Sequence, residues 1–259
     1  MNLIMGKVEK VNHLKNIAYF VAIFFSLSTV ATTQALGQDA ANSNPPLDLT
    51  GYWVSVVTEG WRMRMVIPEK GDYESTAMTP AAREIADSWD PALDTASGEE
   101  CRWYGAGGVM RIPGRLHITW EDENILRVDT EAGSQTRLFH FDPSSIDPSS
   151  EHSWQGVSKA EWLLADGGRE PGSSSGGRLV VSTDQLRMGY IRRNGVPYSD
   201  QTELTESYYS FTEPNGDSWL IITTFYDDPI FMTRQFVEST HFKKVDGSVW
   251  NPTECSAYR

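Results

Sequence analysis

Six polar side chains on the expected β-strands have types suited to acid/base chemistry or to holding an anion. They are Arg64, His117, Arg137, Glu206, Tyr208 and His241. A histidine can move a proton near neutral pH, tyrosine or glutamate can assist it, and arginine can hold a carboxylate or an enolate. If the polar faces of these strands line an interior, the side chains converge as one site. His117, Glu206 and Tyr208 are then the catalytic candidates, and Arg64, Arg137 and His241 bind the ligand.

The alternation that supplies these candidates also supports a competing interpretation. Polar residues at every second position usually mark the solvent face of a half-buried strand. His117, between Leu116 and Ile118, is the residue to test first. His140 lies between Phe139 and Phe141 and is expected to be packed.

The aromatic content is the second clue to function. The chain has nine Trp and ten Tyr, and large rings with one polar handle suit an apolar or aromatic ligand as well as an ordinary barrel core. Trp53, Trp61, Trp120 and Tyr208 are the ones expected near a cavity.

Motifs for cofactors and metals are absent. The sequence has no nucleophile elbow, phosphate loop, dinucleotide fingerprint or paired-His zinc motif. The glycine-rich run Gly105–Gly108 is expected to be a turn or a bulge, because no helix follows to present its N-terminus to a phosphate. We therefore expect no cofactor and no metal, and any enzyme activity would be cofactor-independent.

The N-terminus is typical of a secretory signal peptide. Lys7, Lys10 and Lys15 precede the apolar run Ile17–Ala31, and the small residues of Thr32–Gly37 allow cleavage after Gly37. The apolar run is shorter than the roughly 20 residues of a membrane-spanning helix, although an uncleaved anchor remains an alternative. The sequence therefore predicts an exported protein, periplasmic or secreted, without stable membrane insertion after cleavage.

The net charge and the two cysteines limit the possible partners and the cellular compartment. The net charge is −13, which disfavours nucleic acids and anionic membrane surfaces as partners. Cys101 and Cys255 are the two cysteines, and in an oxidising compartment an even pair predicts a disulfide. Closing a loop of that length contributes about 4–5 kcal/mol in chain-entropy estimates. A zinc site or a catalytic thiol is the weaker alternative.

The pattern of turns and alternating segments predicts ten to eleven strands and one helix. The helix is expected over Ala81–Trp89, with Thr79 as its N-cap and Pro80 at its first position. Asn194-Gly195 indicates a two-residue primed turn, and Asp166–Gly177 is expected to be the most mobile internal loop. The extended segments from which this count is drawn are Gly51–Glu59 with Trp61–Ile67 after Gly60, Val109–Ile112, Leu116–Trp120, Ile125–Thr130, Gln135–Phe141, Trp154–Leu164, Leu179–Thr183, Leu186–Arg193, Leu204–Phe211, Trp219–Tyr226 and Phe231–Val245.

Short strands at regular spacing predict an all-β fold, a single antiparallel barrel that avoids exposed edges. We expect it to occupy residues 48–259, after a flexible leader at residues 38–47. The clearest segment is the last fifth of the chain, where three alternating strands follow one another and must cover a core on one side.

Two short motifs carry a family likeness. Gly51-Tyr52-Trp53 resembles the Gly-x-Trp that opens the lipocalin barrel, and the later hairpins resemble its up-and-down topology. The segments Leu204-Thr205-Glu206, Thr223-Thr224 and Asp228-Pro229, with Thr233, resemble a group of exported bacterial proteins without an assigned activity. The resemblance implies a barrel with a ligand cavity and transfers no reaction.

Three function hypotheses follow. The leading one is binding of a small hydrophobic or aromatic molecule in the barrel. The second is a cofactor-independent isomerase, lyase or hydrolase that uses His117 with Glu206 or Tyr208 and an arginine clamp. The third is a structural or assembly protein with a solid barrel. An enzyme requires His117, Glu206 and Arg64 or Arg137 to lie within hydrogen-bonding distance at a cavity wall.

Overall fold

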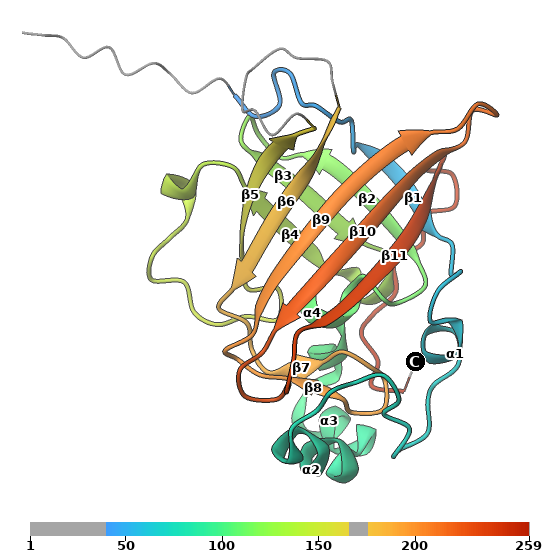
Figure 1. Ribbon diagram of the computed structural model, residues 1–259, viewed down its shortest axis with the longest axis vertical. Coiled ribbons are helices and arrows are strands. Elements are labelled where there is room, and N and C mark those ends of the chain that lie inside the picture. The colour runs from blue at the N-terminus through green and yellow to red at the C-terminus, as the bar shows by residue number, and fades with distance from the viewer. Residues whose placement is uncertain (1–39, 166–175, 259) are drawn as a thin grey trace, which may run out of the picture. The chain divides into compact units, whose positions relative to one another are not determined.

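The computed structural model describes residues 40–165 and 176–258. The predicted signal segment and most of the predicted mobile loop lie outside these residues. The described chain forms a closed barrel of nine strands in the order β1-β11-β10-β9-β6-β5-β4-β3-β2 (Figure 1), so the predicted fold class is confirmed. The barrel strands are β1 (Gly51–Ser55), β2 (Arg115–Trp120), β3 (Ile125–Thr130), β4 (Thr136–His140), β5 (Val157–Leu164), β6 (Gly177–Asp184), β9 (Glu203–Thr212), β10 (Ser218–Asp227) and β11 (Phe236–Val245).

One pair of neighbouring strands is parallel. β4 and β5 pair in parallel through Phe139 with Ser158 and through His140 with Lys159, whereas the other barrel neighbours are antiparallel. An odd number of strands cannot alternate direction around a closed ring, so nine strands require such a pair. The connection through residues 141–156 returns the chain to the start of the parallel strand. The barrel therefore differs from the eight-stranded up-and-down barrel of lipocalins.

The predicted helix is present, and other helices accompany it. α2 (Pro80–Ser88) begins where predicted, since the Thr79 side chain accepts a hydrogen bond from the Ala82 amide. Asp90, just after this helix, caps the start of α3 (Pro91–Ser97) by accepting a hydrogen bond from the Ala92 amide. The remaining helices in the described residues are short: α1 (Trp61–Arg64), α4 (Ala106–Val109), and the 3-10 turns η1 (Glu100–Tyr104), η2 (Ala132–Ser134) and η3 (Pro143–Ser145).

Three predicted strands were wrong over most of their length, and two others are shorter than predicted, since β1 ends at Ser55 and β11 begins only at Phe236. Trp61–Ile67 contains α1 and a loop, because Gly60, at φ 54°, turns the chain away from the sheet after β1. Val109–Ile112 continues from α4 as buried turns. Within Leu186–Arg193 only β7 (Gly189–Tyr190) is extended, and it pairs with β8 (Pro197–Tyr198). Short apolar runs do not distinguish a strand from a buried turn.

The turn at Asn194-Gly195 differs from the predicted primed turn. A type I′ turn requires positive φ at both central residues, but only Gly195 adopts one, at 83°. The Gly195 amide instead donates to the Arg192 carbonyl, and the Ile191 amide donates to the Val196 carbonyl. The Asn194 side chain is occupied elsewhere, since its amide nitrogen donates to the carbonyls of residues 69 and 72.

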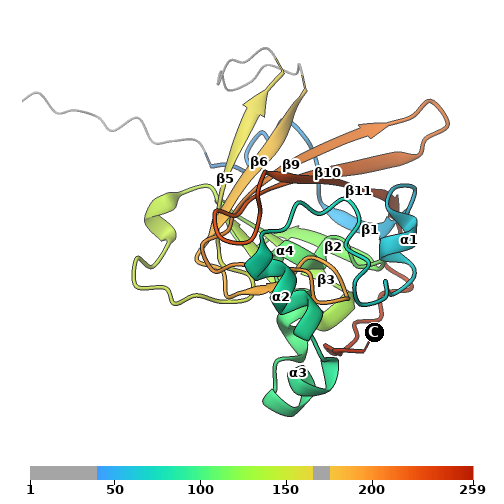
Figure 2. The ribbon, with the colours of Figure 1, turned by 60° about the horizontal axis from the view of Figure 1, so that its bottom comes forward.

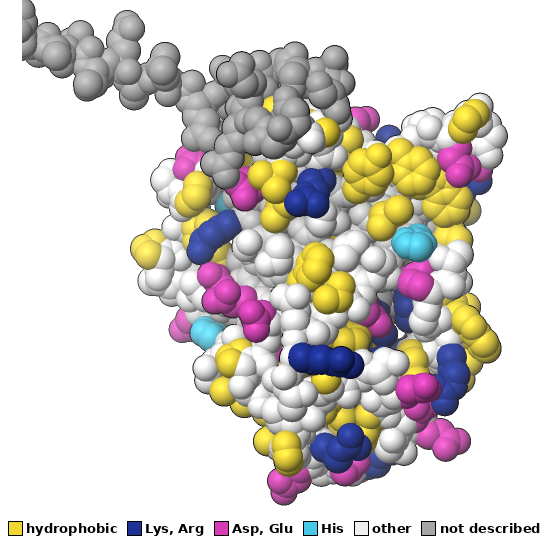
Figure 3. Space-filling view, viewed as in Figure 1, with side chains coloured by type: hydrophobic (Ala, Val, Ile, Leu, Met, Phe, Trp, Pro, Cys, Tyr) yellow, Lys and Arg dark blue, Asp and Glu magenta, His cyan; other side chains and the backbone are white. Residues whose placement is uncertain are grey.

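Alternation along the long strands separates an inner from an outer face. On β9 the residues Leu204, Glu206 and Tyr208 are buried, whereas Tyr209 and Phe211 are exposed and stack 6.0 Å apart. Figure 3 shows hydrophobic side chains gathered over this part of β9 and β10. The inner face forms the main core, whose largest members include Trp53, Phe139, Tyr208 and Phe242.

A plug made of residues 103–112 closes one end of the barrel. All its residues are buried, and α4 lies across the end of the strands (Figure 2). The Tyr226 hydroxyl of β10 donates to the Gly107 carbonyl at 2.9 Å. A Cβ on Gly107 would lie 2.6 Å from the Tyr198 ring. The glycine-rich run thus permits close packing of the plug against the strands and the β7–β8 hairpin.

We expect Gly108→Ala to destabilise the plug strongly. The added Cβ would lie 2.3 Å from the Trp103 carbonyl oxygen and 2.6 Å from that of Tyr190, and these backbone atoms cannot move aside easily. Overpacking of this kind costs about 1–3 kcal/mol or more. Gly114→Ala is the matched control, since its nearest contact, the Ala132 Cβ, is at 3.5 Å. Equal urea midpoints for the two variants would contradict this packing.

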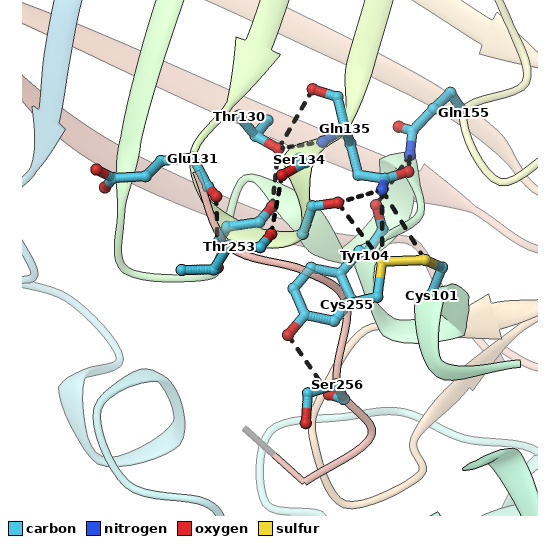
Figure 4. The surroundings of a disulfide bond; sticks show 12 residues. Cys101, Tyr104, Thr130, Glu131, Ser134, Gln135, Gln155, Thr253, Cys255 and Ser256 are labelled. Atoms are coloured by element: carbon cyan, nitrogen blue, oxygen red, sulfur yellow. Dashed lines mark hydrogen bonds between the residues drawn. A yellow bond between two sulfur atoms is a disulfide. The ribbon is translucent and has the colours of Figure 1, made fainter. Parts of the chain in front are cut away.

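The predicted disulfide between Cys101 and Cys255 is confirmed, with a Cα–Cα distance of 5.1 Å (Figure 4). It joins the residues that lead into the plug to the C-terminal segment. Nearby, the Thr253 amide donates to the Glu131 carbonyl at 2.8 Å and the Ser134 hydroxyl donates to the Thr253 carbonyl at 3.0 Å. No helix among residues 40–165 and 176–258 is long and apolar enough to cross a membrane.

Candidate functional site

A buried ion pair lies inside the barrel at the level where the strands meet the plug. Arg137 of β4 and Glu206 of β9 are bidentate, with nitrogen–oxygen distances of 2.9 and 2.5 Å, and both side chains are 0% exposed. The same guanidinium donates to the Thr183 hydroxyl at 3.2 Å, which lies 2.8 Å from the Ser158 hydroxyl. The Tyr208 hydroxyl donates to Glu206 at 3.3 Å. The hydrogen-bonded network around the pair therefore spans four strands, β4, β5, β6 and β9.

Electrostatics keep Tyr208 and Arg137 each in one protonation state. Burial raises the pKa of Tyr208 well above its ordinary value, and the adjacent Glu206 carboxylate raises it further. Burial by itself lowers the pKa of Arg137, but the Glu206 carboxylate outweighs burial and raises it above the ordinary value. Tyr208 therefore stays a neutral donor and Arg137 stays charged near neutral pH. The arrangement fixes charges in place and is poorly suited to moving a proton.

A second ion pair lies at the same level. Glu206, Thr224 and Glu238 are neighbours in register across β9, β10 and β11. Arg111 of the plug is 2% exposed and pairs with Glu238. This pair attaches the plug to the wall of the barrel. Together the two pairs form a polar layer between the main core and a second apolar cluster around the plug and Leu204.

The opposite end of the barrel carries a ladder of aromatic rings. Trp120 is the last residue of β2, Phe141 comes directly after β4, and Trp162 lies on β5. The ring centroids of Trp120 and Phe141 are 5.5 Å apart, and those of Phe141 and Trp162 are 5.4 Å apart. All three are half-buried and pack on the main core together with Leu47. The Trp162 indole donates to the Ala41 carbonyl at 3.2 Å, so leader residues lie against the ladder.

The two histidine candidates lie on the outer face. The His117 ring stacks on Tyr52, with centroids 4.1 Å apart, and lies 5.9 Å from Trp250. His241 contacts Thr58 at 2.9 Å and the Glu59 carboxylate at 3.2 Å. The structure therefore brings Arg137, Glu206 and Tyr208 together and leaves His117 and His241 on the other side of the wall.

The remaining candidates are dispersed. Trp53 is in the core, 1% exposed, and its indole donates to the Leu49 carbonyl at 2.8 Å. Trp61 is 61% exposed on α1. Arg64 is buried outside the lumen, where it pairs with Glu59 and donates to the Arg111 carbonyl at 2.9 Å.

Sequence reasoning missed several members of the polar layer and the aromatic ladder. These are Arg111, Ser158, Thr183, Thr224, Glu238, Phe141 and Trp162. The sequence signal that could have found the polar-layer residues is a polar residue on an otherwise apolar strand face. Thr183, for example, shares its face of β6 with Leu179 and Val181. Within the described part of the chain, no cluster of three or more His, Cys, Asp or Glu could hold a metal ion.

Fold and site define a closed mixed β-barrel with a plug at one end, a charged layer above it and an aromatic ladder at the far end. Comparisons with protein-family models, curated proteins and solved structures found no match.

Proposed function

We propose that this protein is an exported binding protein, which holds a small hydrophobic or aromatic molecule in its barrel against the aromatic ladder. The observation that carries the proposal is the half-burial of Trp120, Phe141 and Trp162 on the inner side of one barrel end. Aromatic rings present large flat surfaces at low entropic cost, and a ligand that stacks on them removes apolar area from water.

The rest of the barrel supports an entry route at this end. The opposite end is filled by the plug and sealed by the polar layer. The described leader residues make few hydrogen bonds at this end, those of Ala41 with Trp162 and Asn124 and those of Asn42 with the carbonyls of residues 122 and 123, so a ligand could displace them at small cost. The proposal keeps the lipocalin-like manner of binding, although the strand number differs. The disulfide supports export.

The structure bears differently on the two alternative hypotheses, an enzyme and a solid barrel. The enzyme hypothesis required His117 beside Glu206, and His117 stacks on Tyr52 outside the barrel instead. The solid-barrel hypothesis is favoured by the dense packing of the main core, whose members include Ile118, Val128 and Leu220, each 0% exposed. Titration with an apolar ligand distinguishes ligand binding from a solid barrel.

Titration with the fluorescent apolar probe N-phenyl-1-naphthylamine tests the proposal. We expect saturable binding to the wild-type chain and binding roughly ten- to thirtyfold weaker in Trp120→Ala, the loss typical of a buried aromatic anchor. Trp120→Phe retains a ring and should restore most of the affinity. Trp61→Ala is the matched control, because Trp61 is exposed on α1, and should bind like the wild type.

Two outcomes would count against the proposal. Absence of saturable binding in the wild type, together with no thermal shift across a panel of hydrophobic compounds, would favour the solid barrel. Equal losses in Trp61→Ala and Trp120→Ala would place the probe on the outer surface.

A further inference from the structure

A separate pocket lies outside the barrel lumen, between the plug, α1 and the C-terminal segment. Its volume is about 300 Å³, at the lower end of the range for small-molecule sites. Its apolar wall consists of Met65, Ile112, Pro113 and Ala132. Segments distant in sequence thus meet there, and the pocket depends on the tertiary fold.

Arg193 enters this pocket from a turn that is firmly held. The neighbouring Asn194 is 0% exposed, and its side-chain amide donates to the carbonyls of residues 69 and 72 at 3.1 and 2.9 Å. Gly195 packs on Trp89 so closely that a Cβ would lie 2.3 Å from the Trp89 Cβ. The position of the Arg193 backbone is therefore fixed before any ligand arrives.

The guanidinium of Arg193 lacks a partner among the described residues. Its Nε is buried without a hydrogen bond, and no carboxylate of the described chain forms an ion pair with it. Burial lowers the pKa of Arg193, and Tyr104 raises it. Near neutral pH an arginine guanidinium stays charged. A half-buried cation without a carboxylate partner is destabilising unless a ligand supplies the anion.

The other arginine at the pocket is already committed. The Arg64 guanidinium donates to the Arg111 carbonyl at 2.9 Å and to the Ser55 hydroxyl at 3.3 Å, and it pairs with Glu59. The donors available to a ligand are therefore those of one planar guanidinium. One such fork matches a planar carboxylate in two parallel hydrogen bonds.

We propose that this pocket binds a small carboxylate with an apolar body, held by Arg193 and packed on Met65, Ile112 and Pro113. A monoanion fits a site with a single uncommitted positive charge, and the apolar wall excludes water from the ion pair, which strengthens it. The chain as a whole carries a net charge of −13, so attraction of an anion is local to this pocket and should weaken as salt screens it.

Isothermal titration with sodium benzoate and sodium hexanoate tests this assignment on the full mature chain. We expect saturable binding of at least one of them to the wild type and no binding of neutral benzamide. Arg193→Gln should weaken binding roughly tenfold or more, the loss of a charge-assisted hydrogen-bonding pair. Arg193→Lys keeps the charge without the fork and should be intermediate. Arg234→Gln is the control, because Arg234 is exposed.

A stability readout separates binding from folding. Since Arg193 donates no hydrogen bond within the described chain, Arg193→Gln without ligand should melt at the wild-type temperature or above it. Trp120→Ala should leave carboxylate binding unchanged, so failure of the aromatic-ladder proposal would not affect this one. Binding of neither carboxylate to the wild type, equal binding to Arg193→Gln, or loss of binding in Trp120→Ala would overturn the assignment.

Discussion

Glu206→Ala is expected to lower the free energy of unfolding by about 3–5 kcal/mol, because it leaves the Arg137 guanidinium charged and unpaired in a fully buried site. Arg137 and Glu206 are both 0% exposed, and their bidentate contact is supplemented by Thr183 and Tyr208. Urea denaturation followed by tryptophan fluorescence measures the change.

A double substitution and a surface-pair control test whether the loss in Glu206→Ala comes from the unpaired buried charge. Replacing both charges, with Arg137→Met and Glu206→Leu, should recover most of the loss, since apolar replacement of a whole buried pair is often neutral or stabilising. Lys159 and Asp184 form a matched surface pair, 3.3 Å apart and 50% and 42% exposed, and Lys159→Ala should cost less than about 1 kcal/mol. An equal loss of unfolding free energy in Glu206→Ala and Lys159→Ala would contradict the burial of the Arg137–Glu206 pair.

Removal of the disulfide, by Cys101→Ser with Cys255→Ser, should cost about 2–5 kcal/mol. The bond closes a loop with a sequence separation of 154 residues, and its loss frees the unfolded chain to explore more conformations. The folded state loses an anchor as well, since Thr253 and Ser256 near the bond contact η2 and Tyr104.

Reducing agent supplies the control for this variant. Dithiothreitol should lower the urea midpoint of the wild type towards that of the double-serine variant and should leave the variant itself unchanged. A double-serine variant as stable as the oxidised wild type would show that the C-terminal segment is held by its hydrogen bonds alone.

The C-terminal meander was the part of the fold best predicted from sequence. β9, β10 and β11 are long, and alternation over ten residues each leaves little freedom in register. β3 was found at the predicted Ile125–Thr130. The short elements failed because their backbone is set by tertiary contacts. The apolar residues of the plug are buried without alternation, so periodicity carried no information about them.

The candidate site shows which polar residues can be predicted from the sequence to lie inside the barrel. Glu206 shares its strand face with Leu204 and Tyr208, and Arg137 shares its face with Phe139; all five are buried. His117 shares its face with polar neighbours and lies outside. A charged residue that interrupts an apolar face therefore indicated the interior better than a fully polar face did. The Arg193 pocket left no such pattern, since residues from distant segments form its wall.

A crystal structure of the mature chain saturated with N-phenyl-1-naphthylamine tests the central claim most directly. The account predicts probe density between Trp120, Phe141 and Trp162 at the barrel end, with the leader displaced from the Trp162 indole and the Arg137–Glu206 pair unchanged. Density confined to the outer face of β9 and β10, or a ladder unaltered and unoccupied in saturated crystals, would contradict it.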